Sequence, residues 1–220
     1  MDKLLFRSMK LIGSIFLVFF LFACGIQKQQ NLSFQGKLVY LISGDKFDPN
    51  AKDSSNFQLV YAKDSMLRVE NFTPIGKQIY IKHIPKNRAY ILMDLHTRKV
   101  AIKSIPEPPP NTGKYKFNKK FGSTKIAGKK AKNIQVEIPD IDSSFLMHYF
   151  DDISHKYSEA IPGMPGLPVK YTLFSNDEFM NYELILFEEK ELSIDLFGIP
   201  SDYTIMTMDE FIDLMEEENF

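Results

Sequence analysis

Alternation of apolar and polar residues is the main pattern of this chain from Phe34 onward. In residues 34–43, the apolar positions Phe34, Leu38, Tyr40 and Ile42 fall on one side of an extended chain. Because successive side chains of a β-strand point to opposite faces, this period of two predicts a strand with one buried face. The same pattern predicts further strands over residues 57–63, 66–71, 77–84, 88–95, 97–103, 115–121, 124–126, 131–138, 168–174 and 181–189.

The inward and outward positions can be predicted for individual strands. In residues 77–84, Ile79, Ile81 and His83 share one face. In the strand over 181–189, one face is expected to carry Tyr182, Leu184 and Leu186, and the other Glu183, Ile185 and Phe187.

Turn-forming residues separate the predicted strands at short intervals. They include Asp48-Pro49-Asn50, Thr73-Pro74 and Pro85-Lys86-Asn87. Such short connections favour antiparallel neighbours, because a parallel crossover needs about a dozen residues. The proline-rich segment 106–110 (PEPPP) predicts a stiff, extended connection within one sheet and not a domain boundary.

The period changes near the C-terminus. Thr207 and Glu210 have the spacing of a capping box, T-x-x-E, at the start of a helix. One apolar stripe follows at helical spacing, formed by Met208, Phe211, Ile212 and Met215. We therefore expect a mainly β (α+β) fold, in which a short C-terminal helix docks on the sheet by this stripe.

The N-terminus has the composition of an export signal. Lys3, Arg7 and Lys10 precede a run of 13 uncharged residues, 11–23. A membrane-spanning helix needs about 20 apolar residues, so this run has the length of a signal peptide. We predict that residues 1–23 are removed; the alternative is an uncleaved signal anchor.

Residues 21–25 (LFACG) resemble the lipobox of bacterial lipoproteins. The resemblance implies that the thiol of Cys24 is acylated and that the chain is cut just before it. Cys24 is the single cysteine of the chain, which excludes an intramolecular disulfide. The polar residues 24–33 then form a flexible tether, and residues 34–220 form one domain.

Composition and charge limit the classes of partner. With 44% hydrophobic and 25% charged residues, the chain is an ordinary globular protein. Loss of residues 1–23 removes one acidic and three basic residues and changes the formal net charge from −1 to −3. This balance gives no support for a nucleic-acid partner. We expect a monomer in the bacterial cell envelope, held to a membrane by its N-terminal lipid, with the domain facing the periplasm or the exterior.

Three further motifs resemble the GLPGLI proteins, a family of unknown function. They are residues 163–168 (GMPGLP) before the strand 169–174, residues 124–131 (TKIAGKKA) before 134–138, and residues 192–203 (LSIDLFGIPSDY). The resemblance implies a fold like that of the lipoprotein carrier and receptor of the bacterial Lol pathway. In that fold a curved antiparallel sheet forms an incomplete barrel, helices cover its open side, and an apolar cavity lies between. The family supplies no catalytic residue and no cofactor, and this chain departs from its pattern at Ala131 and Pro168.

The predicted half-barrel gives a hypothesis about ligand binding. An apolar or lipid-like ligand, such as an acyl chain or the lipid of another lipoprotein, would occupy the cavity. Candidate wall residues are Phe34, Tyr40, Ile81, Leu92, Met164 and Leu167. The loop 161–168 could form a lip of the cavity or, equally, a rigid packed connection.

Two other classes of function stay open. Residues 114–132 carry eight lysines and no acidic residue, which could serve an interaction module of the envelope. If residues 143–156 are helical, His148, Asp151 or Asp152, and His155 share one face and could bind a metal ion for an enzyme. A solvated surface is the alternative for both. No nucleophile motif such as G-x-S-x-G is present, so we expect no catalytic site.

Overall fold

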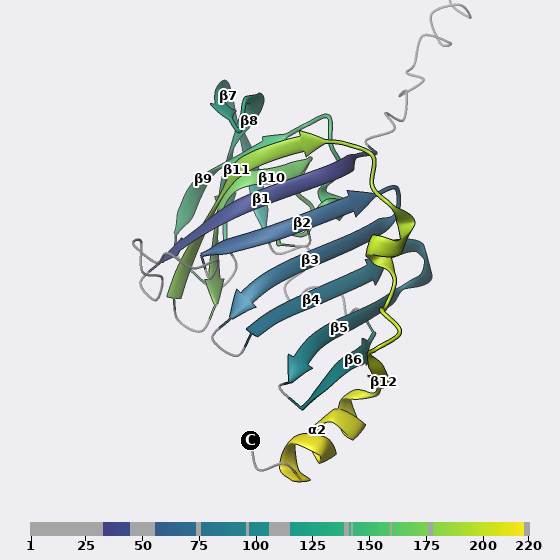
Figure 1. Cartoon of the computed structure of the whole chain (residues 1–220). Helices are drawn as coiled ribbons and strands as arrows, with labels where there is room; N and C mark the ends of the chain where they lie inside the picture. The colour runs from purple at the N-terminus through teal and green to yellow at the C-terminus, as the bar shows by residue number, and fades with distance from the viewer. Residues whose placement is uncertain are drawn as a thin grey trace, which may run out of the picture. The chain divides into compact units, whose positions relative to one another are not determined.

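One sheet of 12 strands dominates the described residues (Figure 1). In this computed structural model, the described residues are 33–44, 56–73, 76–95, 97–105, 115–138, 141, 143–158, 160–175 and 178–217. The predicted signal peptide, Cys24, the tether up to residue 32, the turns at 48–50 and 74, and segment 106–110 lie outside them. The described residues all belong to one compact unit, Leu32–Phe220.

The first eleven strands form two consecutive antiparallel meanders, which lie side by side in the one sheet. Their order across the sheet is β12-β6-β5-β4-β3-β2-β1-β11-β10-β9-β8-β7, and all pairs are antiparallel except β12 with β6. The bounds are β1 (Gln35–Gly44), β2 (Phe57–Lys63), β3 (Met66–Thr73), β4 (Gly76–His83), β5 (Arg88–Leu95), β6 (Arg98–Ser104), β7 (Lys116–Ile126), β8 (Lys129–Glu137), β9 (Ser144–Phe150), β10 (Leu167–Ser175), β11 (Glu178–Glu189) and β12 (Thr204–Met206).

The sheet is curved, and its two edge strands, β12 and β7, do not pair with each other (Figure 1). It is therefore an incomplete barrel. Three short 3-10 helices, η1 (Ile84–Lys86), η2 (His155–Tyr157) and η3 (Ile194–Phe197), and the helix α2 (Met208–Glu217) complete the described elements. The predicted mainly β fold with an open curved sheet and a C-terminal helix is confirmed.

The main hydrophobic core fills the concave side of the sheet. Buried side chains from β1, β2, β3 and β8–β11 meet there with the segment 151–167. Within this segment, Tyr157 is 1% exposed, and its hydroxyl accepts a hydrogen bond from the N–H of Phe34 (3.1 Å) and donates one to the carbonyl of Asp64 (2.8 Å). Tyr157 thus fixes segment 151–167 against the beginning of β1 and the β2–β3 turn.

A second layer covers the convex face over β3–β6. Residues 190–203, which we call the strap, pack Ile199 and Tyr203 against a cluster of buried side chains: Ile79, Ile81, Leu92 and Ala101. Basic side chains bind the carbonyl groups of the strap: Lys63 donates to Leu192 (2.6 Å), and Arg68 donates to Leu196 (3.0 Å). Figure 1 shows the strap passing the ends of β2–β5.

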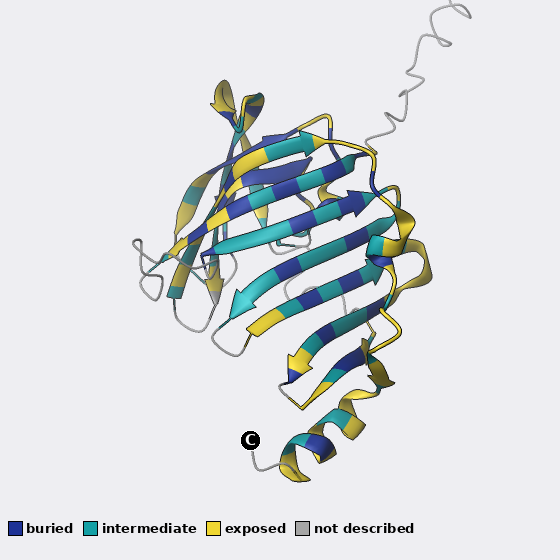
Figure 2. Cartoon of the chain, in the orientation of Figure 1, coloured by how far each residue is buried: buried dark blue, intermediate teal, exposed yellow. Residues whose placement is uncertain are grey.

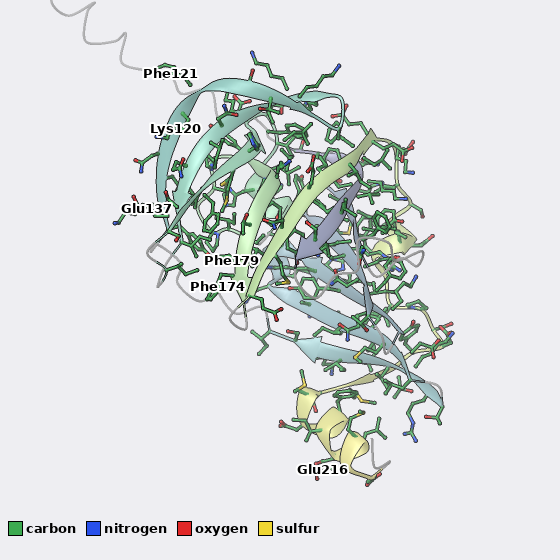
Figure 3. The ribbon with its side chains drawn as sticks, turned by 90° about the vertical axis from the view of Figure 1, so that its left-hand side faces the viewer. Lys120, Phe121, Glu137, Phe174, Phe179 and Glu216 are labelled. Carbon is green, nitrogen blue, oxygen red and sulfur yellow. The ribbon has the colours of Figure 1, made fainter. Side chains whose placement is uncertain are left out.

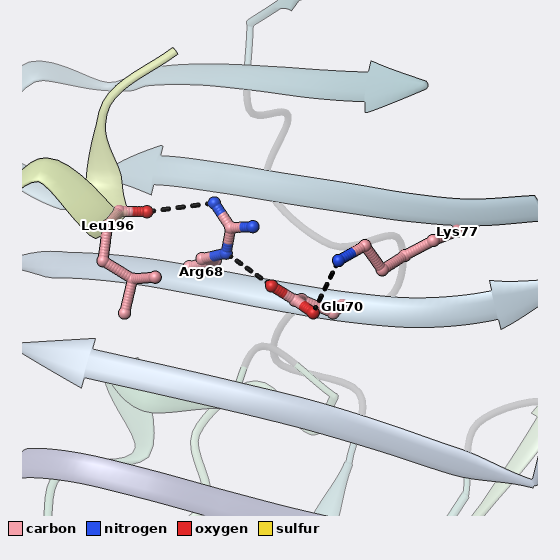
Figure 4. Close-up of polar contacts among 4 residues, drawn as sticks. All are labelled: Arg68, Glu70, Lys77 and Leu196. Carbon is pink, nitrogen blue, oxygen red and sulfur yellow. Dashed lines mark hydrogen bonds and ion pairs between the residues drawn. The ribbon is translucent and has the colours of Figure 1, made fainter. Parts of the chain in front are cut away.

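The contact between Arg68 and the strap belongs to a small buried ionic network (Figure 4). Arg68 Nε lies 2.7 Å from Glu70 Oε1, and Lys77 Nζ lies 3.3 Å from Glu70 Oε2. The side chains of Arg68 and Glu70 are 11% and 9% exposed. Loss of Arg68 would leave Glu70 with one charged partner and the Leu196 carbonyl without its donor.

We expect Arg68→Met to lower the free energy of unfolding by about 2 kcal/mol, because the buried carboxylate of Glu70 loses one of its two cationic partners. Lys116→Met is the matched control, since the Lys116–Glu137 pair is 75% and 42% exposed and should contribute nothing measurable. Urea unfolding of both variants measures the difference. Equal stability of the two variants would show that the network holds nothing in place.

The helix α2 begins with the predicted capping box. Thr207 N–H donates to Glu210 Oε2 (2.6 Å), and Glu210 N–H donates to Thr207 Oγ1 (3.3 Å). The predicted docking stripe is corrected: Met208 and Ile212 are exposed, and the helix packs on β6 through Phe211, Leu214 and Met215. The helix is thus rotated about its axis relative to the predicted stripe, and much of it is exposed (Figure 2).

The predicted faces of β11 are wrong beyond Ile185, because the strand contains a bulge there. Val39 pairs with Leu186, but Tyr40 pairs with Leu184, so Ile185 is an extra residue in the ladder. An extra residue reverses the inward and outward sides beyond it. Leu184 is therefore buried as expected, whereas Leu186 is exposed and Phe187 packs on the core.

Candidate functional site

A pocket of about 270 Å³ opens beside the main core, between the inner face of β1–β4 and the strands β10 and β11. The segment that follows η2 forms one side of it. Its lining is mostly apolar and contains five tyrosines but no charged residue among those described. The lining residues are Tyr40, Gln58, Val60, Leu67, Val69, Asn71, Tyr80, Tyr157, Ser158, Ala160, Tyr171, Leu173 and Tyr182.

The strand register brings the tyrosines together. Tyr171 of β10 and Tyr182 of β11 are directly opposite each other, and their rings stack at 4.9 Å with an interplanar angle of 1°. Tyr40 of β1 meets Tyr171 edge to face at 6.0 Å. The Tyr40 hydroxyl donates to the carbonyl of Pro168 (2.9 Å), and Tyr171 is hydrogen-bonded to Ser158. Because these two hydroxyls already have partners, the rings offer the pocket chiefly carbon surface.

Two amide side chains form the polar part of the pocket. Gln58 Nε2 donates to Asn71 Oδ1 (2.9 Å) across the β2–β3 pair. Each amide can form more hydrogen bonds than this single one. The pair can therefore donate to and accept from one uncharged polar group of a ligand.

Burial raises the pKa of Tyr40 and of Tyr171 well above the usual value. In the unfolded chain the same phenols ionise at about pH 10. Above that pH the unfolded state therefore releases protons that the folded state retains. Stability from these groups is complete below pH 10 and falls as the pH rises above it.

We expect the free energy of unfolding to fall by about 1.4 kcal/mol per pH unit and per buried tyrosine above about pH 10. Urea unfolding at pH 9, 10 and 11 measures this slope, and Tyr40→Phe should make it shallower by one group. A flat profile would mean that both phenols titrate normally in the folded protein.

The six predicted wall residues do not form one wall. Tyr40 lines the pocket. Phe34, Met164 and Leu167 are buried in the same core but do not line the pocket. Ile81 and Leu92 lie on the convex face, beneath the strap, so the prediction that all six share a cavity is corrected. The strap, which the sequence did not reveal as a second layer, buries this face.

The loop 161–168 is a packed connection. Ile161, Met164 and Leu167 are each no more than 1% exposed, so they belong to the core. Gly166 lies so close to β9 that a Cβ there would overlap the carbonyl oxygen of Phe150 and lie 2.9 Å from Tyr149 Cδ2. Of the two predicted roles for this loop, the structure shows the packed one.

Residues 143–156 do not form the helix on which the possible metal site depended, so its ligands do not share a helix face. Residues 144–150 form the strand β9, and His148 is 9% exposed with Nδ1 3.0 Å from Asn133 Oδ1. Burial, followed by the charge of Lys170, lowers the pKa of His148. Asp151 and Asp152 instead pair with Lys132 and Lys129. In the part of the chain that the structure describes, no three potential ligands gather as a metal site.

The lysine-rich segment forms the hairpin β7–β8, with predicted strands 115–121 and 124–126 joined into the one strand β7. Lys116 pairs with Glu137 (2.9 Å), and Lys129 pairs with Asp152 (2.6 Å). Phe121 is fully exposed at a bulge of β7 and points outward beside Lys120 (Figure 3). The hairpin therefore presents a basic surface with one exposed aromatic ring.

Comparison with known proteins gives a likeness of fold. No protein-family model and no curated protein matches the sequence. A structure of PNGF-II in space group P21 is similar with a TM-score of 0.52 at 15% identity, over 84% of this chain and 34% of that chain. A second structure of PNGF-II, in space group C2, gives 0.50 at 14% identity, over 84% and 33% of the two chains. The resemblance to GLPGLI proteins stays a prediction.

No helix of the described residues is long and apolar enough to span a membrane. Attachment through Cys24 stays a prediction.

Proposed function

We propose that this chain is a non-catalytic envelope lipoprotein that binds an uncharged, largely apolar ligand in the tyrosine-lined pocket. The supporting observation is the pocket itself: about 270 Å³ of open space within the concave side of the half-barrel, lined by aromatic rings. Ligand pockets for small molecules usually span about 300–1,000 Å³. The volume here suits part of an acyl chain or a small ring system.

The lining favours a neutral ligand. No lysine, arginine or histidine of the described residues lines the pocket. Moving an ionised carboxylate into such a site without a cationic partner is costly, whereas an ester, alcohol or amide needs only hydrogen bonds. Gln58 and Asn71 can supply these bonds. The ligand is then an acyl ester, alcohol or amide and not a free fatty acid.

A dye titration tests this proposal. Residues 30–220 are titrated with the neutral dye N-phenyl-1-naphthylamine, and the bound dye is displaced with 1-decanol or with decanoate at pH 8. We expect dye binding, and a dissociation constant for decanoate at least about tenfold higher than for decanol, a difference of 1.4 kcal/mol. Absence of dye binding, or equal displacement by both competitors, would contradict the proposal.

The anchor requires a separate test. In bacteria that express the full chain and are fed labelled palmitate, the label should enter the wild-type protein and not Cys24→Ser. The variant should also leave the membrane fraction, because two or more acyl chains give stable anchoring. Unlabelled wild-type protein, or retention of residues 1–23, would contradict the proposed lipid anchor at Cys24.

The β7–β8 hairpin supports a second candidate function, contact with another envelope component. Its specific observation is the fully exposed ring of Phe121 beside Lys120. A contact of this kind should weaken with salt. Phe121→Ser should abolish binding to a purified partner while leaving dye binding unchanged.

A further inference from the structure

A second pocket, of about 230 Å³, lies on the convex face where β4 ends and β5 begins. His83, Lys86, Arg88 and Tyr90 line one side of it, and strap residues 197–199 line the other. The strap closes the pocket through a contact between His83 Nε2 and the carbonyl of Phe197 (3.3 Å). The pocket is thus formed jointly by a strand turn and the second layer.

The turn concentrates positive charge in this pocket. His83 and Arg88 are directly opposite each other in the β4–β5 ladder, and Lys86 lies in the 3-10 helix η1 between them. Asn87, with φ 45°, fixes the turn by donating its N–H to the carbonyl of Ile84 (3.3 Å). Two cationic side chains and one imidazole therefore come from six consecutive residues.

Acidic groups do not neutralise this charge within the described part of the chain. No aspartate or glutamate there lines the pocket, and neither Lys86 nor Arg88 forms an ion pair there. The full chain has a net charge of −1, so the cluster does not reflect a generally basic protein.

We infer that this pocket binds a phosphate-bearing anion. An arginine fork matches two phosphate oxygens, and a lysine adds a point charge. Beside these groups, the side chains of Tyr90, Phe197 and Ile199 offer apolar surface to the ester part of the ligand. The volume equals that of about eight water molecules, which is enough for a phosphate group and the atoms joined to it.

The position of the pocket favours a phospholipid headgroup as the source of the phosphate. The ladder aligns Gln35 with Lys63, Met66 with His83, and His83 with Arg88. With Lys63 paired to Met66, Gln35 and Arg88 lie in one row, four strand spacings or about 19 Å apart. If residues 24–33 form the tether that the sequence predicts, a random coil from Cys24 to Gln35 would span about 18 Å. This choice of source rests on the proposed anchor; the phosphate site does not.

Calorimetric titration of the full chain in a neutral detergent tests the inference. The probes are sn-glycero-3-phosphoglycerol, which is a phospholipid headgroup without acyl chains, and inorganic phosphate. The pocket variant is Lys86→Gln with Arg88→Gln, and the control is Lys119→Gln with Lys120→Gln, which removes two exposed lysines from β7. We expect the pocket variant to raise the dissociation constant at least about tenfold and the control to leave it within about twofold.

The two probes separate the sources. Tighter binding of the diester supports a lipid headgroup, and tighter binding of inorganic phosphate supports a free phosphate. Failure of both probes to bind the wild type, or equal binding by the pocket and control variants, would overturn the site. Diester binding by a protein that carries no acyl group at Cys24 would contradict the proposed anchor and still support the phosphate site.

Discussion

Ala160→Phe should abolish binding of N-phenyl-1-naphthylamine, with a dissociation constant at least about tenfold above that of the wild type. Ala160 lines the pocket from the segment between η2 and β10, and its side chain is half-buried. A phenyl ring at this position would enter the space between the β1–β4 wall and the tyrosines Tyr171 and Tyr182. Because the new ring occupies the ligand's volume, the fold need not change for binding to be lost.

Ser201→Phe is the matched control for this substitution. Ser201 lies in an exposed turn of the strap and does not line the pocket, so the same added ring should leave dye binding unchanged. Thermal unfolding of both variants checks that they remain folded. Undiminished dye binding by folded Ala160→Phe would place the dye elsewhere.

Gly166→Ala should lower the free energy of unfolding by about 3 kcal/mol, at the upper end of the usual cost of overpacking. The added methyl group would overlap the backbone carbonyl of Phe150. Backbone atoms cannot rotate out of the way as the end of a flexible side chain could. Leu167, the next residue, pairs with Phe150, so the beginning of β10 would have to move away from β9.

Gly198→Ala provides the comparison for Gly166→Ala. Its backbone φ is −91°, and a Cβ would meet Asp195 O at 3.3 Å, a contact that a small shift relieves. Alanine also restricts the unfolded chain, so the net change should be near zero. Urea unfolding measures both variants. A Gly166→Ala protein as stable as Gly198→Ala would show that β9 and β10 can separate freely at this point.

The two-residue period predicted most strands because each buries one face. Leu38, Tyr40 and Ile42 of β1 are all buried as expected, and so are Ile79 and Ile81 of β4. Alternation does not predict the strand β9, and His148 and the acidic residues after it would also fit a helical spacing. The faces of β11 beyond Ile185 could not be predicted, because the bulge is fixed by pairing with β1.

The pocket forms because of the strand register, which could not be predicted from the sequence. Tyr171 and Tyr182 meet because β10 and β11 pair in one particular alignment, and Tyr157 reaches Asp64 across 93 positions of the chain. Tyr40 was predicted because alternation alone marks it as inward. A signal for the others was present in the tyrosines on the predicted strands around 171 and 182, but their common pocket needed the tertiary fold.

The structure explains why glycines occur in the motif at 163–168 that resembles the GLPGLI proteins. Gly163 has φ +80°, in the left-handed region that favours glycine, and Gly166 permits a close backbone approach. Both requirements concern packing and backbone geometry. The motif therefore explains how the loop fits the core and identifies no catalytic residue.

Native mass spectrometry of residues 30–220 after incubation with bacterial envelope lipids tests the central claim most directly. We expect one uncharged, apolar molecule bound per wild-type chain, and none bound to Ala160→Phe. A wild-type spectrum that shows only the mass of the polypeptide, or the same bound mass on both proteins, would contradict a ligand in the tyrosine-lined pocket.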